Sequence, residues 1–123
     1  STAGITPDTR YPWGQCTWWA ATRRADIGKP IPGWGNAATW AGSAASAGYT
    51  VDGSPSAGSV IVFQPGVLGA SADYGHVAMV EEVRGDGSIL ISESNALGLG
   101  VVSTREISAS QLAAAGNGVR YIH

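Results

Sequence analysis

Helical and strand-like patterns occupy different halves of this chain, and their order is the strongest constraint on its fold. Helices are predicted over residues 15–27 and 36–48, where apolar side chains recur with helical spacing. Strands are predicted over the segments that follow, at residues 59–64, 76–83, 88–93, 101–107 and 120–123, and residues 108–114 are predicted to form one or two helical turns. Because helices come first and strands follow, instead of alternating, the sequence predicts an α+β fold with an antiparallel sheet.

The second predicted helix carries recognisable signals at both ends. Asn36 is a favourable N-cap residue, since its side chain can accept a hydrogen bond from the first turn. Gly48 suits the C′ position, where the backbone often turns left-handed, and Tyr49 is predicted to close over the helix end.

The length and composition fit one globular domain. The chain has 123 residues, of which 44% are apolar and 13% are charged, enough for one core and too few for two. Residues 1–10 are predicted to be a flexible N-terminal segment and residues 11–123 to be the folded domain. The loose start at Ser1 to Gly4 favours a domain excised from a larger multidomain protein, and we expect this domain to be a monomer.

The charge and hydropathy patterns argue against several kinds of partner. The net charge is −2 and the seven Lys and Arg residues are scattered, so no basic stripe is available to bind nucleic acid. No apolar run approaches the roughly 18 residues that a membrane-spanning helix needs, so no membrane partner is expected. The two histidines, His76 and His123, lie far apart in the sequence, and no His/Cys cluster has zinc-type spacing. We therefore expect neither a metal nor a cofactor.

The only cysteine of the chain, Cys16, stands at the predicted start of the first helix. A thiol in the first turn of a helix lies near the positive end of the helix dipole, which favours the thiolate. A lone cysteine in an apolar chain is more often an inert, buried thiol. The position therefore predicts a nucleophile only if a base and an orienting group lie beside it.

Three polar residues on two neighbouring predicted strands are candidates for these partners. His76 begins one strand, and Glu93 and Asn95 come at the end of the next. Because strand side chains alternate between faces, the length of the hairpin loop decides whether the three lie together. A four-residue loop that pairs Val83 with Ser88, or a two-residue loop, places them on one face, whereas a three-residue loop separates them unless a bulge restores the parity. The simpler alternative is that His76 is an ordinary surface residue and that the other two solvate a strand end.

Five segments of the sequence, taken together and in order, point to a known family. They are YPWGQCTWWAATRR, WGNAATWAGSAASAGYTV, PSAGSVIVF, GHVAMVEEV and ISESN. With them, the chain from Tyr11 to about Ile122 resembles the CHAP family, the cysteine, histidine-dependent amidohydrolase/peptidase domains of bacterial and phage cell-wall hydrolases. The resemblance implies a compact papain-like α+β fold, in which the cysteine begins a helix packed on an antiparallel sheet. It also implies that peptidoglycan is the substrate and that the protein is secreted, cell-wall associated or released as a phage lysin.

The resemblance also implies roles for individual residues. Cys16 is implied to be the nucleophile, His76 the base, Glu93 the acidic orienting group and Asn95 the amide of the site. The backbone N–H of Cys16 is expected to stabilise the oxyanion, and the side chain of Gln15 is expected to help because of its position beside the nucleophile.

Calcium is not expected, although some phage members of the family carry an acidic calcium-binding loop just before the nucleophile. In the corresponding stretch of this chain Asp8 is the only acidic residue, and it is followed by Arg10. One carboxylate is a poor cage for a cation that prefers about six to eight oxygen ligands.

The aromatic residues divide between the core and a possible groove. Trp19 and Trp40 occur at helical spacing and are predicted to lie in the core. Trp13 and Trp34 lie in glycine-flanked turns, where they either pack into the core or line a substrate groove together with Tyr74.

Two classes of function fit these residues. The first is a hydrolase in which Cys16 attacks an amide bond of the peptidoglycan stem peptide or cross-bridge, as an endopeptidase or an N-acetylmuramoyl-L-alanine amidase. The second is a non-catalytic wall-binding module on the same fold, which would have no need of Cys16, His76 and Glu93 together.

Overall fold

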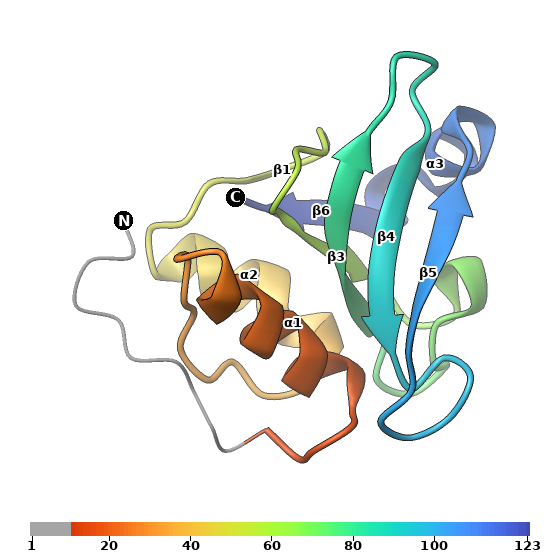
Figure 1. Cartoon of the computed structure of the whole chain (residues 1–123). Coiled ribbons are helices and arrows are strands. Elements are labelled where there is room, and N and C mark those ends of the chain that lie inside the picture. The colour runs from red at the N-terminus through yellow and green to blue at the C-terminus, as the bar shows by residue number, and fades with distance from the viewer. Residues whose placement is uncertain (1–10) are drawn as a thin grey trace.

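The computed structural model describes residues 11–123, and the predicted flexible segment, residues 1–10, lies outside the described residues. The helices are α1 (Cys16–Asp26), η1 (Ala37–Thr39), α2 (Trp40–Ser46), η2 (Val67–Gly69), α3 (Ala109–Ala115) and η3 (Gly116–Gly118), where η marks a short 3₁₀ helix. The strands are β1 (Val51–Asp52), β2 (Val60–Phe63), β3 (His76–Val83), β4 (Ile89–Ser94), β5 (Val102–Ile107) and β6 (Val119–Ile122). The predicted α+β class, with its antiparallel sheet, is confirmed (Figure 1).

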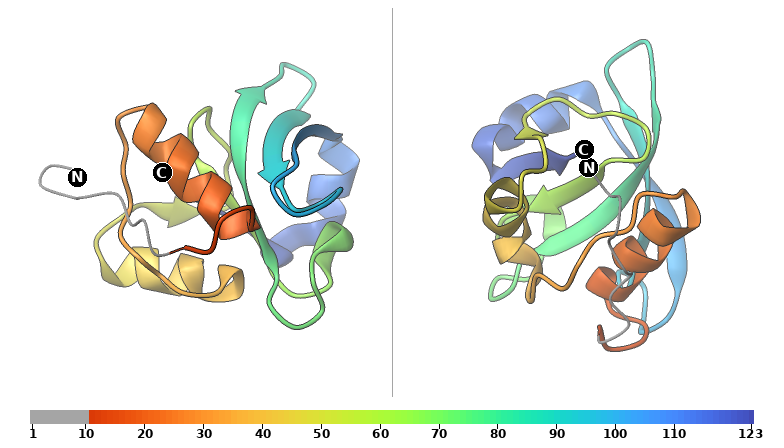
Figure 2. Two further views of the ribbon diagram at one scale, coloured as in Figure 1. Left: turned by 60° about the horizontal axis from the view of Figure 1, so that its bottom comes forward. Right: turned by 90° about the vertical axis from the view of Figure 1, so that its left-hand side faces the viewer.

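The strands described in residues 11–123 form one antiparallel sheet in the order β1-β6-β2-β3-β4-β5. The left-hand view of Figure 2 shows α1 and α2 on one side of this sheet and α3 on the other. Side chains of β2 alternate between the two sides: Val60 and Val62 pack with α1 and α2, and Ile61 and Phe63 pack on the side of α3. Both faces of the central strand are therefore buried. Within the described residues, no helix is long and apolar enough to cross a membrane.

Arg24 anchors α1, which packs against β3 and β4. Its side chain is fully buried, and its Nε donates to the Lys29 carbonyl at 2.9 Å. Its Nη1 donates to the Gly58 carbonyl at 2.8 Å and to the His123 carbonyl at 3.2 Å. One guanidinium thus joins α1 to three other segments through their backbone carbonyls, which holds the helix at a defined position against the sheet.

The second predicted helix forms as η1 followed directly by α2. Asn36 is the N-cap residue of η1, but its side chain forms no capping hydrogen bond within the described part of the chain, so that part of the prediction is wrong. The Asn36 carbonyl instead accepts a hydrogen bond from Thr39 Oγ1 at 2.8 Å. The predicted C-terminal end is confirmed, because Gly48 has a φ of 90° and the Tyr49 N–H donates to the Ala44 carbonyl at 3.0 Å.

The hairpin between β3 and β4 has a three-residue loop. The Arg84 N–H donates to the Ser88 carbonyl at 2.9 Å, which leaves residues 85–87 between the paired ends. Of the three alternatives, the three-residue loop is the one that forms, and the four-residue and two-residue loops do not. Taken alone, this loop would place the polar residues at the far ends of the two strands on opposite faces.

A β-bulge at Glu81 restores the parity. The ladder partners shift between Val80 and Glu82, so Glu81 is an extra residue in β3. Its carboxylate accepts hydrogen bonds from Arg23 Nε of α1 at 3.1 Å and from Ser92 Oγ of β4 at 2.6 Å. The bulge therefore has charged and polar partners on two neighbouring elements. It also returns His76, Glu93 and Asn95 to the same face of the sheet.

Candidate active site

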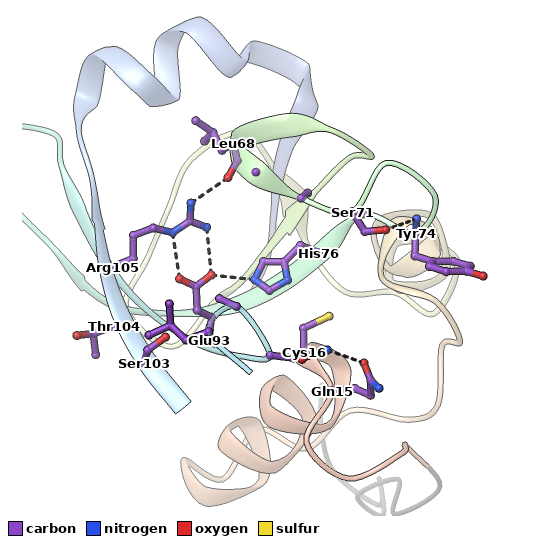
Figure 3. A pocket seen from close by; sticks show the side chains of 16 residues that line it. Gln15, Cys16, Leu68, Ser71, Tyr74, His76, Glu93, Ser103, Thr104 and Arg105 are labelled. Atoms are coloured by element: carbon purple, nitrogen blue, oxygen red, sulfur yellow. Dashed lines mark hydrogen bonds and ion pairs between the residues drawn. The ribbon is translucent and has the colours of Figure 1, made fainter. Parts of the chain in front are cut away.

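A cavity of about 550 Å³ opens where the start of α1 meets the start of β3 and the end of β4 (Figure 3). It is lined by six residues that the sequence analysis singled out: Gln15, Cys16, Tyr74, His76, Glu93 and Asn95. Gly75 and residues 68–71, 96–97 and 103–105 complete its wall. The fold therefore brings together residues that are up to 90 positions apart in the sequence, from Gln15 to Arg105.

The backbone before Cys16 is fixed by the end of β4 and the connection that follows it. Gly14 has a φ of 83°, and a Cβ atom at this position would lie 2.6 Å from the Gly100 nitrogen, so only glycine fits. The Gly14 carbonyl accepts hydrogen bonds from Ser94 Oγ at 2.9 Å and from the Gly100 N–H at 3.1 Å. These bonds place Cys16, the first residue of α1, at the edge of the cavity.

The Cys16 thiol and the His76 ring face this cavity (Figure 3). His76 Nε2 lies 2.9 Å from Glu93 Oε1, so Nδ1 is the ring nitrogen that is left to interact with the thiol. The ring also lies against Phe63 of β2, with 5.5 Å between the ring centroids. The imidazole therefore has a carboxylate on one side, the thiol on the other and an aromatic wall beside it.

The electrostatics of the site favour a charged pair. Burial lowers the pKa of the His76 imidazole, but its hydrogen bonds with Cys16 and Glu93 outweigh burial and raise the pKa to about 9. Burial alone would raise the pKa of the Cys16 thiol, yet the hydrogen bond and positive charge of His76 hold that pKa below its usual value. Over the pH range between these two pKa values, the site contains a thiolate and an imidazolium.

Glu93 is buried, with 4% of its side chain exposed, and both of its oxygens have partners. Oε1 accepts hydrogen bonds from His76 and from Arg105 Nη2, and Oε2 accepts one from Arg105 Nε. Burial raises the pKa of the Glu93 carboxyl, but the hydrogen bond with His76 and the charge of Arg105 outweigh burial and lower it. Glu93 therefore stays a carboxylate while His76 is an imidazolium.

Arg105 is the residue of this site that the sequence analysis missed. The signal that could have found it is the strand register, because Glu93 pairs with Ser103 of β5 and Arg105 follows two positions later on the same face. The register of β5 was not deducible from loop length, since residues 95–101 form a long irregular connection.

Asn95 is bonded to Gln15, the residue before the cysteine. It lies just beyond β4 with a left-handed φ of 66°, and its Nδ2 donates a hydrogen bond to Gln15 Oε1 at 3.0 Å. The structure thus pairs Glu93 with His76 and Asn95 with Gln15. Because Oε1 of Gln15 accepts from Asn95, the other end of the Gln15 amide is the donor that remains available.

The prediction that Trp34 could line the groove is wrong, because only 9% of this residue is exposed. Its ring meets those of Trp40 and Tyr49 edge-on, with centroid separations of 5.6 Å and 5.1 Å. The Trp34 N–H donates to Tyr11 Oη at 2.7 Å, which holds this turn against the core. Burial of a large ring against two others outweighs the tendency of a glycine-flanked turn to remain at the surface.

The other two aromatic candidates stay exposed. Tyr74 lines the cavity. Trp13, which is 62% exposed, is not among the lining residues. Its ring covers Gly100, where a Cβ atom would lie 2.1 Å from the indole, and it packs on Trp18. Trp13 therefore covers the loop that holds the start of α1.

Comparison with known proteins places the chain in a family. The CHAP domain family matches residues 6–95. An N-acetylmuramoyl-L-alanine amidase domain-containing protein of Staphylococcus aureus is 46% identical over 81% of the chain, and the N-acetylmuramoyl-L-alanine amidase sle1 of the same species is 44% identical over 92%. A crystal structure of an N-acetylmuramoyl-L-alanine amidase from S. aureus superposes with a TM-score of 0.87 at 40% identity, over 97% of this chain and 33% of that one.

The chain belongs to the CHAP domain family, as the sequence resemblance indicated. It spans only 16% and 31% of the lengths of the two curated relatives.

Proposed function

We propose that this chain is a catalytic domain that hydrolyses an amide bond of peptidoglycan with Cys16 as the nucleophile. The observation that carries the proposal is the arrangement of Cys16, His76 and Glu93 in one cavity, with a raised His76 pKa and a lowered Cys16 pKa. A nucleophile beside a base that a third group orients is an arrangement suited to covalent acyl transfer. The names of the amidase relatives support peptidoglycan as the substrate.

The first half of the reaction forms an acyl-enzyme. The Cys16 thiolate attacks the carbonyl carbon of the amide, and the electron pair moves to the carbonyl oxygen. The backbone N–H of Cys16 and Nε2 of Gln15 stabilise this oxyanion. The His76 imidazolium then donates its proton to the leaving nitrogen, the C–N bond breaks, and a thioester on Cys16 remains.

The second half of the reaction releases the product. His76, now neutral, takes a proton from a water molecule that attacks the thioester. The thiolate leaves, and the product departs as a carboxylic acid that loses its remaining proton to solvent. The thiolate–imidazolium pair is thereby restored. Glu93 holds the imidazole ring and stabilises its charged form in both halves.

The site of action follows from this substrate. Peptidoglycan lies outside the cytoplasmic membrane, so we infer that the domain works as a secreted or cell-wall-associated hydrolase or as a released phage lysin. The coverage of the relatives supports a domain of a longer, multidomain protein.

The decisive experiment incubates the protein with purified peptidoglycan and measures free amino groups and reducing sugar ends. We expect free amino groups to increase while reducing ends stay constant, because amide hydrolysis frees an amine. New N-terminal L-alanine in the released fragments indicates cleavage of the muramoyl–L-alanine bond, and any other new N-terminus indicates a stem-peptide or cross-bridge bond. Wall binding without release of amines would contradict the proposal and favour a binding module.

Replacement of Asn95 by alanine is expected to slow the release of amines by about tenfold, the effect of losing one positioning hydrogen bond. The Gln15 amide would lose the partner of its Oε1, while the backbone donor of Cys16 would remain. The pH dependence of the rate should not change, because Asn95 is neutral and His76 is paired with Glu93. In a Gln15→Ala background, Asn95→Ala should cost nothing further; a full additional loss would show that Asn95 acts elsewhere.

Removal of metal ions with a chelator is expected to leave both the rate and the melting temperature unchanged. Within residues 11–123, no group of three or more His, Cys, Asp and Glu side chains is placed to hold a metal ion, and Asp8 lies outside the described residues. The measurement compares turbidity clearing and thermal unfolding before and after treatment with EDTA. A loss of activity that calcium restores would contradict the prediction.

A further inference from the structure

Arg105 of β5, in the wall of the cavity, makes polar contacts with all three of its guanidinium nitrogens. Its Nε lies 3.0 Å from Glu93 Oε2 and its Nη2 lies 3.1 Å from Glu93 Oε1, the paired geometry that a guanidinium forms with a carboxylate. Its Nη1 donates to the Leu68 carbonyl at 2.9 Å, and its guanidinium carbon lies 5.5 Å from the centre of the Phe63 ring. All three of its nitrogens are therefore engaged by the protein itself, although 36% of the side chain is exposed.

The paired contact determines how Glu93 presents its oxygens. A carboxylate on a rotatable stem has several orientations, and a single hydrogen bond to His76 would leave most of them open. Two parallel hydrogen bonds from one planar guanidinium select a single orientation. In that orientation Oε1 faces His76 Nε2 at 2.9 Å.

We propose that Arg105 is a positioning residue, which acts on the His76 imidazole by holding the Glu93 carboxylate in the orientation that receives it. The proposal rests on the proposed function, because a well-oriented imidazole matters only if His76 transfers protons. Arg105 does not contact His76 directly among the hydrogen bonds of the described residues; it reaches the ring through the shared Oε1 of Glu93.

The charged groups around His76 make the effect separable. Cys16 approaches the ring from α1 and Glu93 from β4, and β2 contributes the uncharged Phe63 ring. Arg105 acts on this ring in two opposing ways: its positive charge destabilises the imidazolium, and its paired contact holds the carboxylate that stabilises it. Arg105→Met removes both effects, whereas Arg105→Lys keeps the charge and removes only the paired contact. A lower His76 pKa in Arg105→Lys therefore reports the loss of positioning alone.

The first test is a double-mutant cycle with Arg105→Met and Glu93→Gln, measured as release of amines from purified peptidoglycan. Arg105→Met should slow release by about tenfold in the parent protein and should cost nothing further beside Glu93→Gln. Arg105→Lys keeps the charge but cannot form the paired contact, so it should also be slow. Arg84→Met removes another carboxylate-paired arginine, which contacts Glu106 at the surface, and should be as fast as the parent. Parent-like rates for either Arg105 variant, or additive losses in the cycle, would overturn the proposal.

The second test needs no peptidoglycan substrate. Iodoacetamide alkylates thiolates, and Cys16 is the only cysteine in the chain, so the pH dependence of alkylation reports the thiolate and its imidazolium partner. We expect the inflection assigned to His76 to move to lower pH in both Arg105→Lys and Glu93→Gln, because each weakens the contact between the carboxylate and the imidazolium. An inflection that stays in place or rises in Arg105→Lys would overturn the proposal. If the parent protein releases no amines but these shifts occur, the proposed function fails and the contact geometry stands; if the parent is active and the shifts are absent, only the role of Arg105 fails.

Discussion

Replacement of Cys16 by alanine or serine is expected to reduce amine release from peptidoglycan by at least about 10⁴-fold, the scale on which loss of a catalytic nucleophile acts. The chain has no second cysteine that could substitute, and a hydroxyl at this position would stay protonated beside His76. Cys16 is half-buried at the first position of α1, so both small side chains should be tolerated. Thermal unfolding and wall binding should therefore match the parent.

The control separates an inactive site from an unfolded domain. Cys16→Ser preserves the size of the side chain and Cys16→Ala removes its polar atom, so agreement between the two variants excludes an effect of shape. In the parent protein, iodoacetamide should label this residue rapidly near neutral pH, because the neighbouring imidazolium lowers the pKa of the thiol. Substantial amine release by either variant, or labelling only after denaturation, would contradict a cysteine nucleophile.

Replacement of Glu93 by glutamine is the second large expected effect. The shape of the side chain is kept and its charge is removed, so the rate should fall by roughly tenfold to a thousandfold, the range of a positioned acid–base contribution. The imidazolium that Glu93 stabilises has a pKa of about 9, and the reactive ion pair exists only below that value. Without the carboxylate the pKa of His76 falls. Activity should therefore be lost at a lower pH on the alkaline side of the pH–rate profile.

Glu82 supplies a control for this experiment that leaves the bulge at Glu81 intact. It is a carboxylate of the same hairpin, but it is paired with Arg84 at the surface and does not line the cavity. Glu82→Gln should leave the alkaline limb in place. The assignment would be reversed if Asn95→Ala proved the slower enzyme and Glu93→Gln kept the parent rate and pH profile.

Local sequence patterns predicted most of the secondary structure, because the formation of helices and strands depends largely on residues that are close together in the sequence. The strand predicted over residues 76–83 is β3 with the same bounds, and α1 and β5 begin within one residue of their predicted starts. β1 was not predicted, since its two residues, Val51–Asp52, are too few to show an alternating pattern. Its place in the sheet comes from pairing with β6, near the other end of the chain.

The β3–β4 hairpin was only partly predictable from its own sequence. The alternation of side chains showed that a three-residue loop needs a β-bulge if His76 and Glu93 are to lie on the same face of the sheet. The bulge that forms is at Glu81, whose carboxylate bonds to Arg23 of α1 and Ser92 of β4. Neither partner is visible from the hairpin sequence itself.

The sequence by itself determined the class of fold and the positions of Cys16 and His76 at the starts of α1 and β3, because helical spacing, strand alternation and turn residues act over a few neighbouring positions. Only the tertiary structure decided that Trp34 is buried, that Asn95 bonds to Gln15 and that Arg105 holds Glu93. Each of these contacts joins segments that are distant in the chain. Their geometry depends on strand register, on a bulge and on the packing of α1 against the sheet, and a shift of one residue in any strand would turn the same side chains to the other face.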